Sequence, residues 1–399
     1  MRTRSVRART CPVCQEPMRK HGRTAAGSQR WRCTACSLTT TAPRAASRAR
    51  TEQAAPGEFV AWATSNDPQS KQPGAGRAFR RRVSWCWQVP VPHPPVTGEV
   101  FPQVFIDGLY LSGGWTLLVA RNPTHVIAWQ WAGSESAAAY SALLTPIAPP
   151  DLVTTDGAGG ALKALHALWP DTPIQRCLIH IHRDTRRDLT RNPITTQGKA
   201  LLAHSRKLLK ITTPDQAATW LAALNDYGTQ YHHWLDQRTT AEQDPATAAL
   251  TGRKWWYTHA RTRRAYKRLE RLERLARQGT LFAYLADPTG QPRPTPLERT
   301  TNPIEATNHQ IRDRLRHHRG AGPEHQAVII DWTLSQLTAQ PPTPADALKT
   351  WNQNNRRPAT RVPTKTTTTH TSPHPTGWGT TPTPEESLWN RRGWAGRPH

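Results

Sequence analysis

The sequence has few acids and no long apolar stretch. Its 399 residues contain 28 Asp and Glu against 53 Lys and Arg, a formal net charge of +25. A surplus of this size favours a polyanionic partner, and a ribosomal-type protein, a membrane-surface binder and a DNA enzyme all fit it. No apolar run approaches the ~18–20 residues of a membrane span, and no apolar stretch follows the basic start of the chain. We therefore expect no membrane span, no secretory signal peptide and a cytoplasmic location.

Large apolar residues other than Trp are also scarce. The chain has 5 Phe and 2 Met but 17 Trp, and its 36 Pro accompany a hydrophobic content of 36%. This composition predicts a thin core, with part of the chain not globular. The length predicts about two to four domains. Trp is expected to fill bulky core positions, in particular at Trp85, Trp87, Trp115, Trp129 and Trp131.

Four of the six cysteines stand in two pairs near the N-terminus. Cys11 and Cys14 form one C-x2-C pair, and Cys33 and Cys36 form the other after 18 intervening residues. This spacing is typical of one structural Zn²⁺ ion, because each pair presents two thiolates to it. Two disulfides are the alternative, which a reducing cytosol disfavours. We expect residues 1–43 to form a zinc ribbon whose basic side chains contact nucleic acid, although a protein–protein module would also carry them.

The next segment, residues 44–92, has the pattern of a helix-turn-helix. Two helical stretches, Glu58–Ser65 and Ala78–Gln88, flank a turn region rich in Pro and Gly. Short helices around a Gly turn occur in many folds, so other interpretations remain open. In a helix-turn-helix, the second helix would present basic residues to DNA, here Arg80, Arg81 and Arg82.

Strand and helix patterns alternate between residues 99 and 182. Apolar runs between turn residues predict five strands, at Val104–Leu111, Trp115–Arg121, His125–Trp131, Leu152–Asp156 and Ile174–His180. Helical periodicity predicts two helices, at Ser136–Pro146 and Gly160–Trp169. The order βββαβαβ is expected of an α/β fold with a mixed sheet and helices on its faces.

Residues 183–298 lack a strand pattern and are expected to form a helical insertion, with helices at Lys199–Ile211, Gln216–Leu235 and Arg253–Arg277. The last helix would begin with Arg253, Lys254 and three aromatic residues, which suit DNA backbone and exposed bases. An amphipathic helix with a solvated Arg face is the alternative.

The C-terminal part of the chain changes character after one more helical pair. Helices are expected at Pro303–His318 and Glu324–Leu337, within residues 299–338. Residues 339–399 are rich in Pro and Thr, and we expect them to be disordered.

Three acids stand in unusual positions for a chain so poor in them. Asp107 lies inside an apolar strand, Asp156 ends another, and Glu305 opens a helix. Each has a local explanation, since Asp-Gly at the first two positions is a turn signal and Glu305 would complete a capping box after Asn302. Taken together, three carboxylates at one sheet edge could hold two divalent cations about 4 Å apart for phosphodiester cleavage.

These three acids, in Val104–Leu111, Thr155–Gly157 and Thr301–Asn308, resemble the catalytic triad of DDE transposases, in particular the Mutator-type bacterial insertion-sequence family. The resemblance extends from about Val104 to Leu337. It includes Cys177 and His180 after the fifth strand, a helical insertion before the glutamate, and Arg312 seven residues after Glu305. An N-terminal zinc ribbon and a Pro/Thr tail are unusual for that branch.

The resemblance implies a ribonuclease-H-like catalytic domain in two parts, 99–182 and 299–338, interrupted by the insertion. Asp107, Asp156 and Glu305 would hold two Mg²⁺ (or Mn²⁺) ions for DNA cleavage and strand transfer at terminal inverted repeats. The enzyme would act as a homo-oligomer on double-stranded element and target DNA, at the nucleoid.

The resemblance also implies roles for three further residues. Arg312 would hold a DNA phosphate, and Cys177 and His180 would be structural parts of the active-site edge. By themselves, these two residues favour a buried Cys and a strand- or helix-end His over a metal site. The rival functions are a zinc-ribbon DNA-binding regulator with an inactive nuclease fold, and a nuclease or resolvase without strand transfer.

Overall fold

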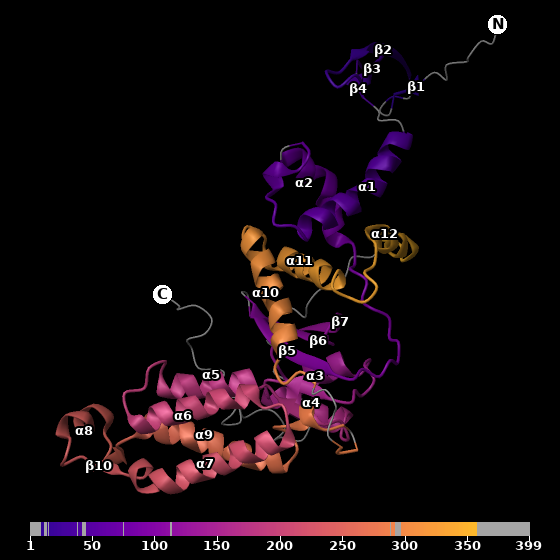
Figure 1. Ribbon diagram of the computed structural model, residues 1–399. Coiled ribbons are helices and arrows are strands. Elements are labelled where there is room, and N and C mark those ends of the chain that lie inside the picture. The colour runs from indigo at the N-terminus through magenta and orange to yellow at the C-terminus, as the bar shows by residue number, and fades with distance from the viewer. Residues whose placement is uncertain are drawn as a thin grey trace, which may run out of the picture. The chain divides into compact units, whose positions relative to one another are not determined.

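The computed structural model describes residues 9–356, except 12–13, 15, 38, 42–44, 75, 112–113, 288 and 292–296. These residues form two compact units (Figure 1). One joins the chain up to Pro90 with the segment that begins at Thr343, and the other is built from Val91–Pro342. None of the described helices combines the length and the apolar character needed to cross a membrane.

A small antiparallel sheet opens the first unit. Its strands follow the chain order, β1 (Arg9–Thr10), β2 (Pro17–Arg23), β3 (Gln29–Cys33) and β4 (Thr39–Thr40). Its buried apolar cluster consists of Met18 with Cys11 and Cys33, and Trp31 packs against it. A cluster this small cannot stabilise a fold of this size by burial alone, so a cross-link such as a metal is needed.

Helices form the rest of the first unit. They are α1 (Ala45–Ala63), a 3-10 turn (Gln69–Lys71), α2 (Arg77–Val83), a second 3-10 turn (Ser84–Gln88) and α12 (Pro344–Gln353). The predicted helix pair is present, and α1 begins earlier than its pattern indicated. Phe79 of α2 packs edge-on against Trp62 of α1, with ring centroids 5.5 Å apart. Arg82 pairs with Glu58 of α1 at 2.6 Å, whereas Arg80 and Arg81 are exposed.

Helix α12 lies in the segment that we expected to be disordered, so that expectation is wrong for residues 344–353. Thr343 and Asp346 form a capping box at the helix start, and Pro344 follows Thr343 directly. At this position Pro and Thr favour a helix start, although their abundance predicts disorder. Trp351 of α12 stacks on Trp85, with ring centroids 5.8 Å apart. The predicted tail beyond residue 356 lies outside the described residues.

The second unit is built on a five-stranded mixed sheet, which confirms the α/β prediction. The strands are β5 (Val104–Leu111), β6 (Trp115–Arg121), β7 (Val126–Ala132), β8 (Val153–Thr155) and β9 (Ile174–Arg176). Their order across the sheet is β7-β6-β5-β8-β9. The first three strands are antiparallel, and β8 and β9 run parallel to β5.

The two faces of β5 have different neighbours. Val104 and Ile106 point into a core that includes Leu143 of α3 (Ala137–Leu144) and Leu165 of α4 (Gly159–Leu168). Because side chains alternate along a strand, Asp107 lies on the opposite face. There it meets α10 (Asn302–His317), which is followed by α11 (Pro323–Ser335) (Figure 1).

The predicted fifth strand, Ile174–His180, ends four residues early. Strand β9 stops at Arg176, and Cys177 is the N-cap of helix α5 (Leu178–Leu189). The apolar run has the pattern of a strand, but its residue Leu178 lies with Ile181 and Leu189 on the buried face of a helix. His180 therefore lies in the first turn of a helix.

The insertion forms a layer of helices that lie side by side in Figure 1, namely α5, α6 (Thr196–Lys207), α7 (Pro214–Leu235) and α9 (Ala260–Arg277). It also contains the short helix α8 (Pro245–Thr251) and 3-10 turns at Leu208–Lys210 and Ala283–Leu285. The prediction of no strands is wrong, because β10 (Arg238–Thr240) and β11 (Trp255–Tyr257) pair as an antiparallel ribbon. Helix α9 consequently starts at Ala260 and not at Arg253.

Asp331 of α11 generates a prediction about stability. Its Oδ1 accepts hydrogen bonds from the indole N–H groups of Trp129 and Trp131 of β7, at 2.9 and 2.8 Å. Removing a shared buried acceptor leaves both donors unsatisfied, so Asp331→Ala should destabilise the protein by about 2–4 kcal/mol. Asp331→Asn keeps an acceptor oxygen and should cost less. Urea unfolding measures both, and an alanine variant as stable as the asparagine variant would contradict the assignment.

Candidate functional site

Asp107 and Asp156 lie next to each other where strand β8 ends beside the central strand β5. We call this region, together with Glu305 of α10, the acidic edge. Ile106 of β5 pairs with Thr155 of β8 in parallel register, so the two acids follow at the same level. Strand β5 continues through Gly108, with Asp107 opposite Val119, so the turn explanation for this Asp-Gly pair is wrong. Burial, together with the carboxylate of Asp156, raises the pKa of Asp107 well above its ordinary value. A cation beside the pair would favour the ionised form of Asp107.

Helix α10 contacts the first acid directly. The side-chain amide of Asn308 donates a hydrogen bond from Nδ2 to Asp107 Oδ2 at 2.8 Å. Asn308 is buried, and it stands three residues after Glu305, so both side chains belong to neighbouring positions of one helix face. The contact fixes the helix that carries the predicted glutamate against the strand that carries the first aspartate.

The second acid sits in a tight turn after β8. Asp156 Oδ1 accepts a hydrogen bond from the backbone N–H of Ala158 at 2.9 Å, and its carbonyl accepts one from Arg176 Nη2 at 3.1 Å. Gly157 has φ +89°, and a Cβ there would collide with the Arg176 guanidinium. Glycine is thus required for both the backbone conformation and the close approach of Arg176. The hairpin-turn explanation is wrong for Asp156 as well, because β8 leads into helix α4 and pairs with β9 in parallel.

Glu135 is a further acid that the sequence reasoning missed. It precedes α3, and its carboxylate occupies the space that a Cβ at Gly108 would fill. Burial, and next the nearby Asp156, raise the pKa of Glu135 to about 8. Its loop position gave no strand or helix signal, but an acid is rare in this chain and could have been noticed for that reason alone.

Glu305 is held by cationic neighbours from α5. Its Oε1 lies 2.9 Å from Arg183 Nη1 and 3.6 Å from His180 Nε2. The N-cap of α10 is Thr301, which makes no side-chain cap hydrogen bond. The carboxylate therefore does not form the expected capping box with Asn302 and faces the α5 residues.

Cys177 and His180 connect the start of α5 to the start of α10. Cys177 is buried, and its sulfur accepts hydrogen bonds from the backbone N–H and the hydroxyl of Thr301, both at 3.2 Å. Burial lowers the pKa of His180, but the Cys177 sulfur and the carboxylates of Asp156 and Asp107 outweigh it and raise that pKa to about 9. A protonated His180 adds positive charge beside Glu305.

The four predicted zinc ligands come together in the N-terminal sheet. The sulfur of Cys11 lies 3.6 Å from that of Cys36, and Cys14 lies 3.4 Å from Cys33. These separations exceed a disulfide bond and approach the ~3.8 Å between sulfurs of a tetrahedral zinc site. All four ligand atoms lie within 4.8 Å of one another, so they could bind one Zn²⁺ ion.

Electrostatics within this cluster also suit a cation. The backbone N–H of Cys36 lowers the pKa of Cys33 to about 6. A backbone hydrogen bond at Glu16 lowers the pKa of Cys14, but contact with Cys33 and burial outweigh it and raise the value to about 12. Without a metal, the contact with Cys14 thus favours the thiolate of Cys33 and disfavours that of Cys14. A bound divalent ion would stabilise all of the cysteines as thiolates.

The acidic edge differs from the cysteine cluster. Among the described residues, the four cysteines are the one group of three or more His, Cys, Asp or Glu side chains with ligand atoms close enough to share a metal ion. Asp107, Asp156 and Glu305 are brought to one region, but their carboxylates do not form such a group.

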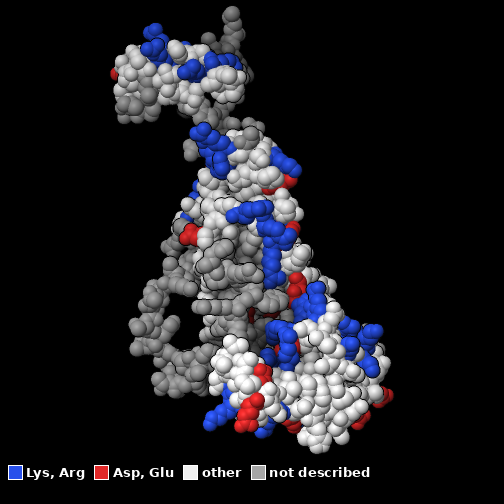
Figure 2. Space-filling view, turned by 90° about the vertical axis from the view of Figure 1, so that its left-hand side faces the viewer, with Lys and Arg blue, Asp and Glu red and all other residues white. Residues whose placement is uncertain are grey.

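The predicted DNA-contact residues differ in their surroundings. Arg312 on α10 is exposed, as are Arg253 and Lys254 before β11. Several basic residues of α9 instead form ion pairs, and Arg268 contacts Asp188 at 3.0 Å and Asp184 at 3.6 Å. Figure 2 shows Lys and Arg in several separate groups over one face, with fewer acids among them.

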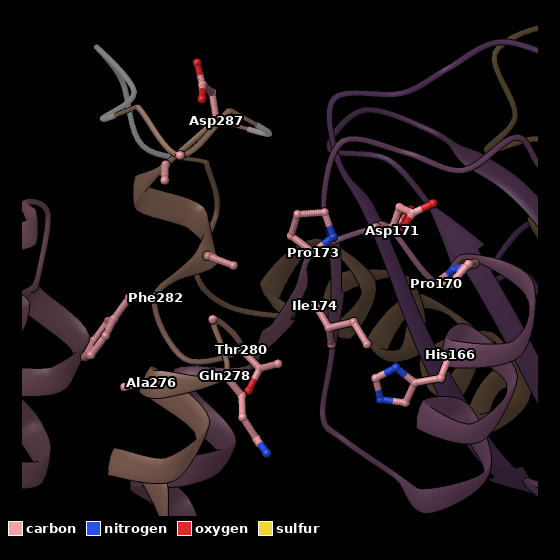
Figure 3. Close-up of a pocket in the computed structure, with 15 residues that line it drawn as sticks. His166, Pro170, Asp171, Pro173, Ile174, Ala276, Gln278, Thr280, Phe282 and Asp287 are labelled. Carbon is pink, nitrogen blue, oxygen red and sulfur yellow. The ribbon is translucent and has the colours of Figure 1, made fainter.

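A cavity of about 500 Å³ lies away from the acids. Its lining includes His166 of α4, Asp171 and Ile174 at the amino end of β9, and Phe282 and Asp287 after α9 (Figure 3). Asp156, by contrast, follows the carboxyl end of the neighbouring parallel strand. The cavity is therefore not part of the acidic edge.

Comparison with known proteins adds no assignment, since no protein-family model and no curated protein matches this chain.

The cysteine cluster predicts a measurable metal content. Purified under reducing conditions, the protein should contain about one zinc ion per chain, and Cys33→Ser should lose it. Cys86→Ala is the matched control, because Cys86 is a buried free thiol outside the cluster. Elemental analysis by mass spectrometry measures the ratio. Equal zinc in the two variants would refute the site.

Glu135 predicts a pH dependence of stability. Its pKa of about 8 in the folded protein lies above its ordinary value of 4.5, so its contribution is complete below about pH 4.5 and is lost as pH rises through 8. Without added divalent cations, the free energy of unfolding of wild type should fall between pH 5 and pH 9. For Glu135→Gln this fall should be smaller by about 1 kcal/mol or more. Urea midpoints at both pH values measure this, and parallel losses would show that Glu135 does not titrate there.

Proposed function

We propose that this protein is a transposase of the DDE type that cleaves DNA at the ends of an insertion sequence and joins them to target DNA. The observation that carries the proposal is the parallel register that places Asp107 beside Asp156, with α10 and its Glu305 packed against the same edge. The strand order and the helical insertion support a ribonuclease-H-like interpretation of the fold.

Carboxylates are the donors that Mg²⁺ or Mn²⁺ prefers, and Asp107, Asp156 and Glu305 would hold two such ions. Bound there, the ions would activate the attacking oxygen and stabilise the leaving oxygen of a phosphodiester. Asn308 orients Asp107, and the turn at Gly157 orients Asp156. Glu305 would exchange its contacts with Arg183 and His180 for a metal contact.

The remaining residues would bind and position DNA. Arg312 lies two turns along α10 from Glu305, about 10.5 Å away on the same face, where it would hold a phosphate beside the carboxylates. The inverted repeats would be contacted by Arg80 and Arg81, which are exposed on α2, and by the N-terminal sheet that carries the four cysteines. Arg82 is engaged by Glu58 and is better assigned to fixing α2. Joining two DNA ends requires two active sites, so we propose a homo-oligomer on DNA.

A second candidate is a DNA-binding regulator with an inactive nuclease fold. The observation that favours it is the Glu305–Arg183 ion pair at 2.9 Å, which occupies a carboxylate that metal catalysis requires. This candidate predicts DNA binding without cleavage, whereas a nuclease without strand transfer would cleave without joining.

The experiment is a strand-transfer assay with Mg²⁺ on linear duplexes that carry the genomic DNA from either side of the gene. Wild type should join their ends to plasmid DNA, and Asp107→Asn, Asp156→Asn and Glu305→Gln should each reduce joining by about 100-fold or more. Asp171→Asn is the matched control, because Asp171 is exposed and lies away from the acidic edge. Wild-type joining by all three variants would refute the assignment.

A further inference from the structure

The β10–β11 ribbon exposes an aromatic side chain on the helical insertion. Trp255 is 44% exposed, and it is the one tryptophan among the large apolar side chains that the described surface exposes. The other Trp residues with described side chains are buried or half-buried. An indole left in solvent where others are covered is a candidate contact surface.

Arginine and aromatic side chains alternate on one face of this ribbon. Trp255 and Tyr257 share a face, because they are two residues apart on β11, and their rings meet edge-on at 5.4 Å. Arg238, which pairs with Tyr257 in the register, lies 4.3 Å from the Trp255 ring centre. Arg263 lies 3.8 Å from the Tyr257 ring centre. These cation–π contacts hold the rings in place while Trp255 stays accessible.

The charge at this face is positive and largely not neutralised. Arg263 pairs with Asp236 at 3.1 Å. Arg238, Arg253 and Lys254 take part in none of the ion pairs that the described residues form. One cation in contact with an exposed indole, and two exposed cations just before it in the chain, suit a ligand that has both a phosphate backbone and a free aromatic face.

We propose that this face, formed by Arg238, Trp255 and Tyr257, binds unpaired nucleotides of DNA, with the exposed Arg253 and Lys254 as cations just before it in the chain. A base would stack on Trp255, and the three cations would contact the adjacent phosphates. Duplex DNA cannot use the indole in this way, because its bases are stacked on one another and present only their edges in the grooves, not their faces. The inference rests on the proposed function in one respect, namely that DNA is the partner.

The test compares full-length variants in binding to a fluorescent oligothymidylate and to a duplex of equal length, by anisotropy at fixed salt. Trp255→Ala should weaken single-strand binding by about 10-fold or more and leave duplex binding within about 2-fold. Trp255→Phe, which keeps a ring, should retain most of the single-strand affinity. Leu250→Ala is the matched control, because it removes another exposed apolar side chain.

Equal losses on both DNA forms, or no loss on either, would overturn the inference, and so would a phenylalanine variant as weak as the alanine variant. Circular dichroism of each variant checks that the fold is retained. The assay needs no cleavage or joining, so its outcome is separate from that of the transposase proposal. A chain that binds single strands through Trp255 but never joins DNA would refute the transposase and keep this site.

Discussion

Two carboxylates on neighbouring parallel strands are the constraint around which the second unit is arranged. Asp107 and Asp156 are brought to one level by the β5–β8 register, and burial together with the Asp156 carboxylate raises the pKa of Asp107. The surrounding contacts offset this effect. Asn308 donates to the first acid, the Ala158 N–H donates to the second, and His180 adds positive charge nearby. Elements distant in sequence therefore meet at this edge because the acids require donors and cations.

The position of α10 depends on contacts made by the segment that connects the insertion to this helix. The buried Gln103 donates from Nε2 to Thr154 at 2.8 Å and to the Glu298 carbonyl at 2.6 Å, and it accepts from the Glu298 N–H at 3.0 Å. Arg121 of β6 then donates to the Pro303 carbonyl at 2.6 Å, at the start of α10. These contacts place Glu305 whatever the length of the insertion, so the fold tolerates a large helical segment between its second and third acids.

Sequence patterns predicted the parts of this fold that have a strong period of their own. Strands β5 and β6 have the predicted bounds, because each is an apolar run closed by turn residues. The three-residue strands β10 and β11 are too short to show a period, and their pairing joins residues distant in the sequence, such as Arg238 with Tyr257. The cysteine spacing predicted the cluster, since two ligand pairs per ion is a local requirement. Glu135 escaped notice because its burial depends on Gly108, which lies in the distant strand β5.

The size of the net positive charge alone does not show which basic residues are available to bind a polyanion. On α9, Arg268 is bound by Asp184 and Asp188 of α5, and Asp188 is buried, so this cation joins two helices of the insertion and is not free for a polyanion. Arg82 serves a similar purpose within the first unit. Other basic residues, such as Arg81, Arg253 and Arg312, are exposed, and a phosphate can approach them. For a basic protein of this kind, the pairing of each arginine decides more about its partner than the net charge does.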